Sequence, residues 1–290
     1  MSLVLRTRIA GGASVPASRL VSSLAPPNRA SAALTRLALV LSILGLTGCA
    51  TRVATPTDAQ FEAIRVRSEA RFERAIYLKP TITNSVPTDA EKFAPLLIIE
   101  AAGASVSAAA PDVDLPREIF FHSGRIQLNG LWHEQKTYWW NYPRRAQGSL
   151  TAQGVRITLN SAGSPAIWEA LADTSGAQVI FVSQSVEAQA SREFGAAQGG
   201  RRFAVERALN ESPRTVVARV IEDGPMPIGP IIYLRGDKHD VTTAICRCMD
   251  SQARELAGQL EYRLTMDRHV ERKLSTSAPL DSLLRLPKAF

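Results

Sequence analysis

The chain has 290 residues, of which 45% are hydrophobic and 21% charged, a balance typical of a folded protein with room for one large domain or two small ones. Its net charge of +7 suggests a nucleic-acid-binding protein at first, but five of the positive charges are arginines in residues 1–48, which contain no acidic residue. Removing these five charges leaves +2 on residues 49–290. That value argues against a body whose overall field attracts nucleic acid, and no nucleic-acid partner is expected.

Residues 1–48 are typical of an export signal. The run LALVLSILGL, which follows Arg36, has ten apolar or small residues. It is too short for a membrane-spanning helix, which needs about 20 apolar residues. It matches the apolar segment of a secretory signal peptide, with positive residues before it and small residues after it.

The last residue of this run and the three that follow it, LTGC, resemble the lipobox of bacterial lipoproteins, and the resemblance covers residues 36–50. It implies that residues 1–48 are removed as a signal peptide and that Cys49 carries a diacylglyceryl group on its thiol. Ala50 stands where retention in the inner membrane usually calls for aspartate. The implied location is therefore the cell envelope, with the protein anchored in the outer membrane and facing the periplasm. Two or more acyl chains supply the contacts that stable anchoring requires.

The positive segment before the apolar run is unusually long, at about 35 residues against roughly 15–30 for a whole signal peptide. One explanation is a translation start assigned too far upstream. Another is a mitochondrial transit peptide, because residues 1–35 are rich in Arg and Ser and free of acids. A transit peptide would not need an apolar run that stops at a small-residue cysteine site, so the lipoprotein interpretation is favoured.

Residues 49–57 are small and polar, as expected of a tether. Residues 58–80 are predicted to form an amphipathic helix, because apolar residues from Phe61 to Ile76 recur at helical spacing and Pro80 ends the pattern. Residues 81–116 are predicted to contain a short helix with a capping box from Thr88 to Glu91, a buried apolar run, and a loop or linker.

Residues 117–269 are predicted to form the globular domain, and residues 270–290 an irregular tail without periodicity. About eight short apolar runs, including RFAVERAL at 202–209, indicate strands, and Asn129-Gly130 between two of them indicates a hairpin. Helices are expected near 185–194 and over 251–264, and there is no βαβ rhythm. The fold class is therefore α+β, a largely antiparallel sheet of about eight strands with flanking helices.

Cys246 and Cys248 are the only cysteines besides Cys49, and an exported protein meets an oxidising compartment. Three interpretations stay open. The pair could form a strained, redox-active disulfide, or a soft-metal site that Met249 and His239 complete, or simply a buried structural pair. The structural interpretation is favoured, because a single pair is a much weaker signal than two CxxC units. No cofactor is expected.

Aromatic residues gather in positions 132–168. Trp132 and Trp139 are candidates for stacking on an envelope glycan, although large aromatic residues in strands are more often part of a core. The other charged clusters are predicted to be ordinary surface features: Arg201-Arg202 a solvated pair, and Asp173 part of turn chemistry.

No motif for catalysis is present, and the chain is not expected to be an enzyme. The leading hypothesis is a lipid-anchored envelope protein that contacts the membrane through its anchor and binds an envelope protein or glycan, or plays a structural role. The alternatives are a thiol redox or soft-metal-handling protein that uses Cys246 and Cys248, and a glycan-binding module.

Overall fold

In the computed structural model the described residues are 58–70, 72, 74–82, 88–101, 115–142, 151–209, 215–224, 228–236, 238–245, 259–267 and 279–290. Residue contacts divide the chain into two units, residues 1–53 and 54–290. All the described residues belong to the second unit.

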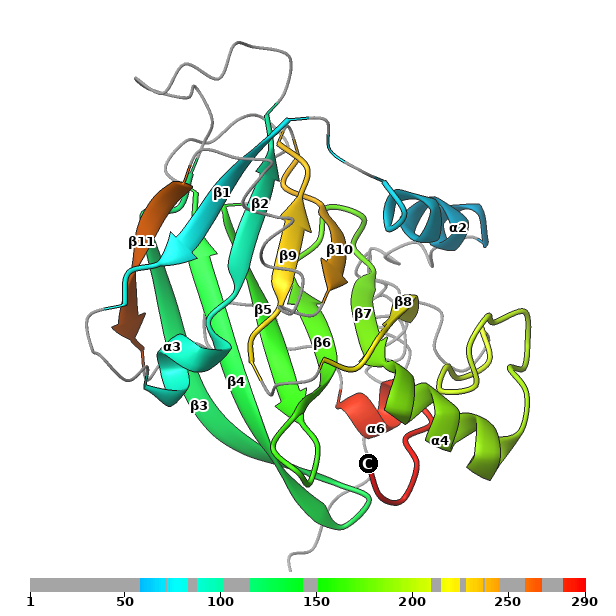
Figure 1. Cartoon of the computed structure of the whole chain (residues 1–290). Coiled ribbons are helices and arrows are strands. Elements are labelled where there is room, and N and C mark those ends of the chain that lie inside the picture. Colours follow the sequence, from blue (N-terminus) through cyan, green and yellow to red (C-terminus); the bar gives the residue numbers. More distant parts are fainter. Residues whose placement is uncertain are drawn as a thin grey trace, which may run out of the picture. The chain divides into compact units, whose positions relative to one another are not determined.

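The described residues form four helices and an eleven-stranded sheet, shown in Figure 1. The helices are α2 (Asp58–Arg67), α3 (Asp89–Phe93), α4 (Gln184–Phe194) and α6 (Leu280–Leu283). The strands are β1 (Ala75–Pro80), β2 (Leu96–Glu100), β3 (Glu118–Leu128), β4 (Leu131–Asn141), β5 (Ala152–Leu159), β6 (Pro165–Leu171), β7 (Gln178–Ser183), β8 (Thr215–Ile221), β9 (Ile231–Leu234), β10 (Val241–Ile245) and β11 (Gln259–Met266). They lie in the order β10-β9-β2-β1-β11-β3-β4-β5-β6-β7-β8.

The α+β class is confirmed, but the expected sheet of about eight mostly antiparallel strands is wrong. The sheet is mixed. Strands β3 to β7 form an antiparallel meander, whereas the pairs β1–β11, β11–β3, β2–β9 and β7–β8 are parallel. Parallel neighbours need long connections, and three of these four pairs join strands far apart in the chain, which a local sequence pattern does not reveal. The fourth pair is a single strand-helix-strand unit, with α4 between β7 and β8.

The sheet curls round so that its two edge strands, β8 and β10, come into contact, although among the described residues they are not hydrogen-bonded to each other. Side chains from all eleven strands meet in one buried cluster inside the curl. Its largest members include Tyr138, Trp140, Phe181 and Tyr262, each at most 1% exposed. Burial of this apolar area drives the curling, at roughly 25 cal/mol per Å².

Helix α3 lies against the interior cluster, and tyrosine hydroxyls bond to the helix and to the segment that follows it. The Tyr138 hydroxyl donates to the carbonyl of Ala90 at 2.8 Å, and the Tyr262 hydroxyl donates to the carbonyl of Pro95 at 2.6 Å. Both hydrogen bonds of the predicted capping box between Thr88 and Glu91 are present, which confirms the predicted start of this helix.

A second core lies on the outer face of β6, β7 and β8. It is formed with α4, α6 and the C-terminal residues, and Leu284, Leu286 and Phe290 are all buried there. The part of the predicted irregular tail that the structure describes, residues 279–290, therefore packs as part of the body. Apolar periodicity did not predict a helix there, because α6 has only four residues and is too short to show a repeat.

Two predicted helices are partly wrong. The helix predicted over 58–80 ends at Arg67, and residues 75–80 are the strand β1; the helix predicted over 251–264 includes residues 259–264, which lie in β11. In β11 the residues Leu260, Tyr262 and Leu264 alternate as a strand requires, and Leu260 and Leu264 also match a four-residue helical spacing. The body consequently begins at α2, and β1 and β2 are inner strands of the sheet that precede the boundary predicted at residue 117.

Candidate functional site

Helix α2 lies across the junction between the sheet edges β8 and β10, with Phe61 and Ile64 in the interior cluster. Just beyond the helix, the Ser68 hydroxyl donates to the carbonyls of Arg65 and, in β8, Ala218. Because these edges share no ladder of hydrogen bonds among the described residues, α2 supplies polar contacts that hold the junction closed.

Arg67 connects α2 to two buried carboxylates, one in the turn between β6 and β7 and the other just before β10. Its Nη2 lies 2.6 Å from Oδ1 of Asp173, whose side chain is fully buried, and its Nη1 lies 3.5 Å from Oδ1 of Asp240. Thr174 donates to Asp240, and Ser175 donates to Asp173. Asp173 was predicted to serve turn chemistry, which its bond from the Ser175 amide confirms, but it also forms this buried ion pair.

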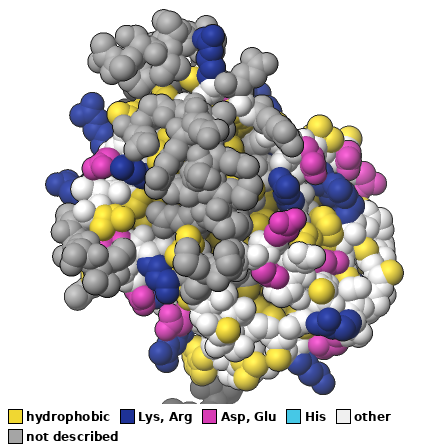
Figure 2. Space-filling view, in the orientation of Figure 1, with side chains coloured by type: hydrophobic (Ala, Val, Ile, Leu, Met, Phe, Trp, Pro, Cys, Tyr) yellow, Lys and Arg dark blue, Asp and Glu magenta, His cyan; other side chains and the backbone are white. Residues whose placement is uncertain are grey.

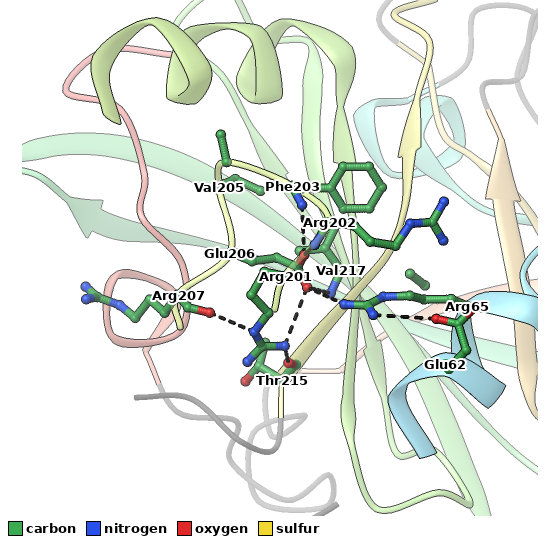
Figure 3. A network of polar contacts seen from close by, with 12 residues as sticks. Glu62, Arg65, Arg201, Arg202, Phe203, Val205, Glu206, Arg207, Thr215 and Val217 are labelled. Atoms are coloured by element: carbon green, nitrogen blue, oxygen red, sulfur yellow. Dashed lines mark hydrogen bonds and ion pairs between the residues drawn. The ribbon is translucent and has the colours of Figure 1, made fainter. Parts of the chain in front are cut away.

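A second network centres on the Glu206 carboxylate, which Figure 3 shows between the guanidinium groups of Arg65 and Arg201. Arg65 Nη2 lies 3.4 Å and Arg201 Nη1 3.5 Å from Glu206 Oε1. The same carboxylate accepts the backbone amides of Arg202, Phe203 and Val217. Glu206 thus joins α2, the segment after α4, and β8 at one buried point.

The expectation that Arg201-Arg202 is a solvated pair is wrong for Arg201. Its side chain is 1% exposed and donates to the carbonyls of Arg207 and Thr215. Burial lowers the pKa of Arg201, and the neighbouring Glu206 carboxylate opposes that shift. Residues 202–209 are not a strand, because two of the backbone amides there bond to Glu206 instead of to a neighbouring strand, and those of Ala204 and Val205 bond to Glu187.

The three cysteines of the sequence predictions, Cys49, Cys246 and Cys248, and Met249 lie outside the described residues. His239, the other suggested ligand, is 3% exposed and stacks on Tyr142 with ring centroids 3.7 Å apart. Among the residues that the structure describes, no group of three or more His, Cys, Asp or Glu is placed to hold a metal ion. The redox and metal hypotheses therefore stay predictions.

The two candidate stacking residues have opposite environments. Trp139 is fully buried, stacks on Phe120 at 4.4 Å between ring centroids, and faces Gly154 on β5. A Cβ at Gly154 would lie 2.5 Å from the carbonyl oxygen of Tyr138, so this position needs a glycine. Because Trp139 is fully buried, the hypothesis that it stacks on a glycan is wrong. Trp132 is 66% exposed beside the Asn129-Gly130 turn, which forms the predicted hairpin between β3 and β4.

On the face of the molecule in Figure 2, basic and acidic side chains are interspersed rather than gathered into one patch of a single sign. No helix within the described parts of the chain is long and apolar enough to cross a bilayer. No protein-family model matches this chain, and no curated protein and no solved structure shows significant similarity to it.

Proposed function

We propose that this chain is a lipid-anchored protein of the bacterial cell envelope that binds another envelope component or plays a structural role there. The observation that carries the proposal is the apolar run that leads into LTGC, with Cys49 as the lipidated residue. Ala50 favours the outer membrane, with the body in the periplasm.

The architecture of the body supports this proposal. Helix α2 begins nine residues after Cys49, a separation that spans at most about 30 Å when fully extended. The helix that comes after the tether is held to the body by the buried ion pairs of Arg65 and Arg67. A pull on the anchor would therefore be transmitted into the folded body at this helix.

The packing of the curled sheet bears on where a partner could bind. Its interior is filled by large side chains such as Trp140 and Tyr262, both essentially without exposed surface. Close packing of this kind leaves a partner to meet the protein at its outer surface. A surface binding role suits a protein presented on a short tether.

The anchor itself gives a direct test. In bacteria that express the full chain, Cys49→Ser is expected to abolish labelling by a radioactive fatty acid and to leave the signal segment uncleaved, because serine lacks the thiol that accepts the diacylglyceryl group. Cys248→Ser is the matched control and should be labelled like the natural chain. Equal labelling of the Cys49→Ser chain would overturn the proposal.

A further inference from the structure

One face of the β3–β4 hairpin combines an exposed aromatic ring with polar side chains. Trp132 lies directly opposite Gln127, and on the next rung of the same face Arg125 lies opposite Glu134. All four side chains are exposed. Residues opposite each other in an antiparallel pair are about 5 Å apart, and rungs on one face repeat about every 7 Å. Donors and acceptors therefore lie within one side-chain length of the indole.

This surface differs from an apolar patch. Leu131, the other exposed apolar residue at the turn, precedes Trp132 in the strand, so the two side chains project to opposite sides of the ribbon. Trp132 is thus a single flat ring among amide, guanidinium and carboxylate groups. A lipid surface would favour a contiguous apolar area edged by cations, and a single indole ring does not form such an area. The Glu134 carboxylate on this face lies 3.3 Å from the Lys136 ammonium group.

The hairpin is held rigid from its other side. The Asn129 side-chain amide donates to the carbonyls of Leu286 and Pro287, each at 3.0 Å. His133 lies 3.0 Å, through Nδ1, from the carbonyl of Leu159, and its ring stacks on Phe290. These contacts fix the turn while the Trp132 face stays open, so a ligand would bind with little loss of backbone entropy.

We propose that this face binds the glycan strands of peptidoglycan. The Trp132 indole would stack on the apolar face of a sugar ring, and Gln127 and Glu134 would hydrogen-bond its hydroxyl and acetamido groups. Arg125 would pair with a peptidoglycan carboxylate. In Figure 1 the hairpin turn lies at the opposite end of the view from α2. This inference rests on the proposed envelope location and names the component bound.

Tryptophan fluorescence tests the proposal at one residue. The chain has four tryptophans, and Trp139, Trp140 and Trp168 are 0%, 0% and 4% exposed. Acrylamide should therefore quench mainly Trp132. For the full lipidated chain in detergent, soluble muramidase fragments of peptidoglycan are expected to protect this fluorescence from acrylamide. Trp132→Phe should remove most of the quenchable signal, which assigns the change to Trp132.

Binding to intact sacculi, measured by co-sedimentation, gives the energetic test. Trp132→Ala is expected to weaken binding about tenfold or more, as for a central aromatic contact, whereas Leu131→Ala should change it less than about twofold. Natural protein that does not sediment with sacculi, or equal weakening by both variants, would overturn the proposal. So would protection of Trp132 by phosphatidylethanolamine–phosphatidylglycerol vesicles without glycan. If Cys49 is labelled by the fatty acid but these binding tests fail, the proposed envelope location is retained and the proposed binding of peptidoglycan is rejected.

Discussion

Replacing Glu206 with glutamine is expected to lower the free energy of unfolding by about 3–5 kcal/mol, because it removes the carboxylate that faces two buried guanidinium groups. Arg65 would keep only its ion pair with the exposed carboxylate of Glu62, at 3.7 Å. Glutamine has nearly the same shape but keeps one acceptor oxygen and gains an amino group. In the natural chain Oε2 accepts two backbone amides, and Oε1 accepts the Val217 amide and faces both guanidinium groups. Whichever way the new amide turns, its N–H groups meet other donors.

The measurement is urea unfolding of the full chain followed by circular dichroism, and Glu261→Gln is the matched control. Glu261 also forms an ion pair at 3.5 Å, with Lys79, but its side chain is 50% exposed. An exposed pair contributes at most about 1 kcal/mol, so the control should unfold almost like the natural chain. Equal urea midpoints for the two variants would contradict this prediction, because they would show that the Glu206 network stabilises the fold no more than an exposed ion pair does.

Local chemistry was enough to predict several elements. The capping box at Thr88, the Asn129-Gly130 hairpin and the buried run at Leu96 all depend on residues a few positions apart, and the structure confirms each one. The positive φ values of Asn129 and Gly130 are those that such a two-residue turn demands.

The arrangement of the strands could not be predicted in the same way. Strand β1 pairs with β11 and β2 with β9, in both cases more than 100 residues away along the chain, and no single-sequence pattern encodes those partners. The burial of Arg201 could not be predicted for a related reason. Charged residue types are usually solvated, and Arg201 is buried because Glu206 and the carbonyls of Arg207 and Thr215 surround its guanidinium group in the folded chain.

Replacing Arg67 with methionine is expected to cost about 3–5 kcal/mol of folding stability and to loosen α2 from the body. Methionine keeps most of the side-chain length but removes the charge that faces Asp173 and Asp240, both of which stay buried. Hydrogen exchange of the α2 amides should rise more than that of β4, because α2 lies outside the sheet and its amides share no strand ladder with the body. Arg263→Met is the control: its ion pair with Glu118 at 3.2 Å is exposed, with the arginine side chain 77% accessible.

A double-mutant cycle of Arg67→Met and Asp173→Asn tests whether the loss of stability comes from a buried carboxylate left without its cation. If buried negative charge is the cause, Asp173→Asn should cost less in the Arg67→Met background than in the natural chain, so the two losses will not add. Strict additivity would contradict this account and would assign the effect to lost packing of the arginine stem instead. The distinction matters for the anchor. If ion pairs hold α2 on the body, neutralising one charged group releases the helix. If packing holds it, the helix stays in place. The joint between tether and body depends on the charge of Arg67 only in the first case.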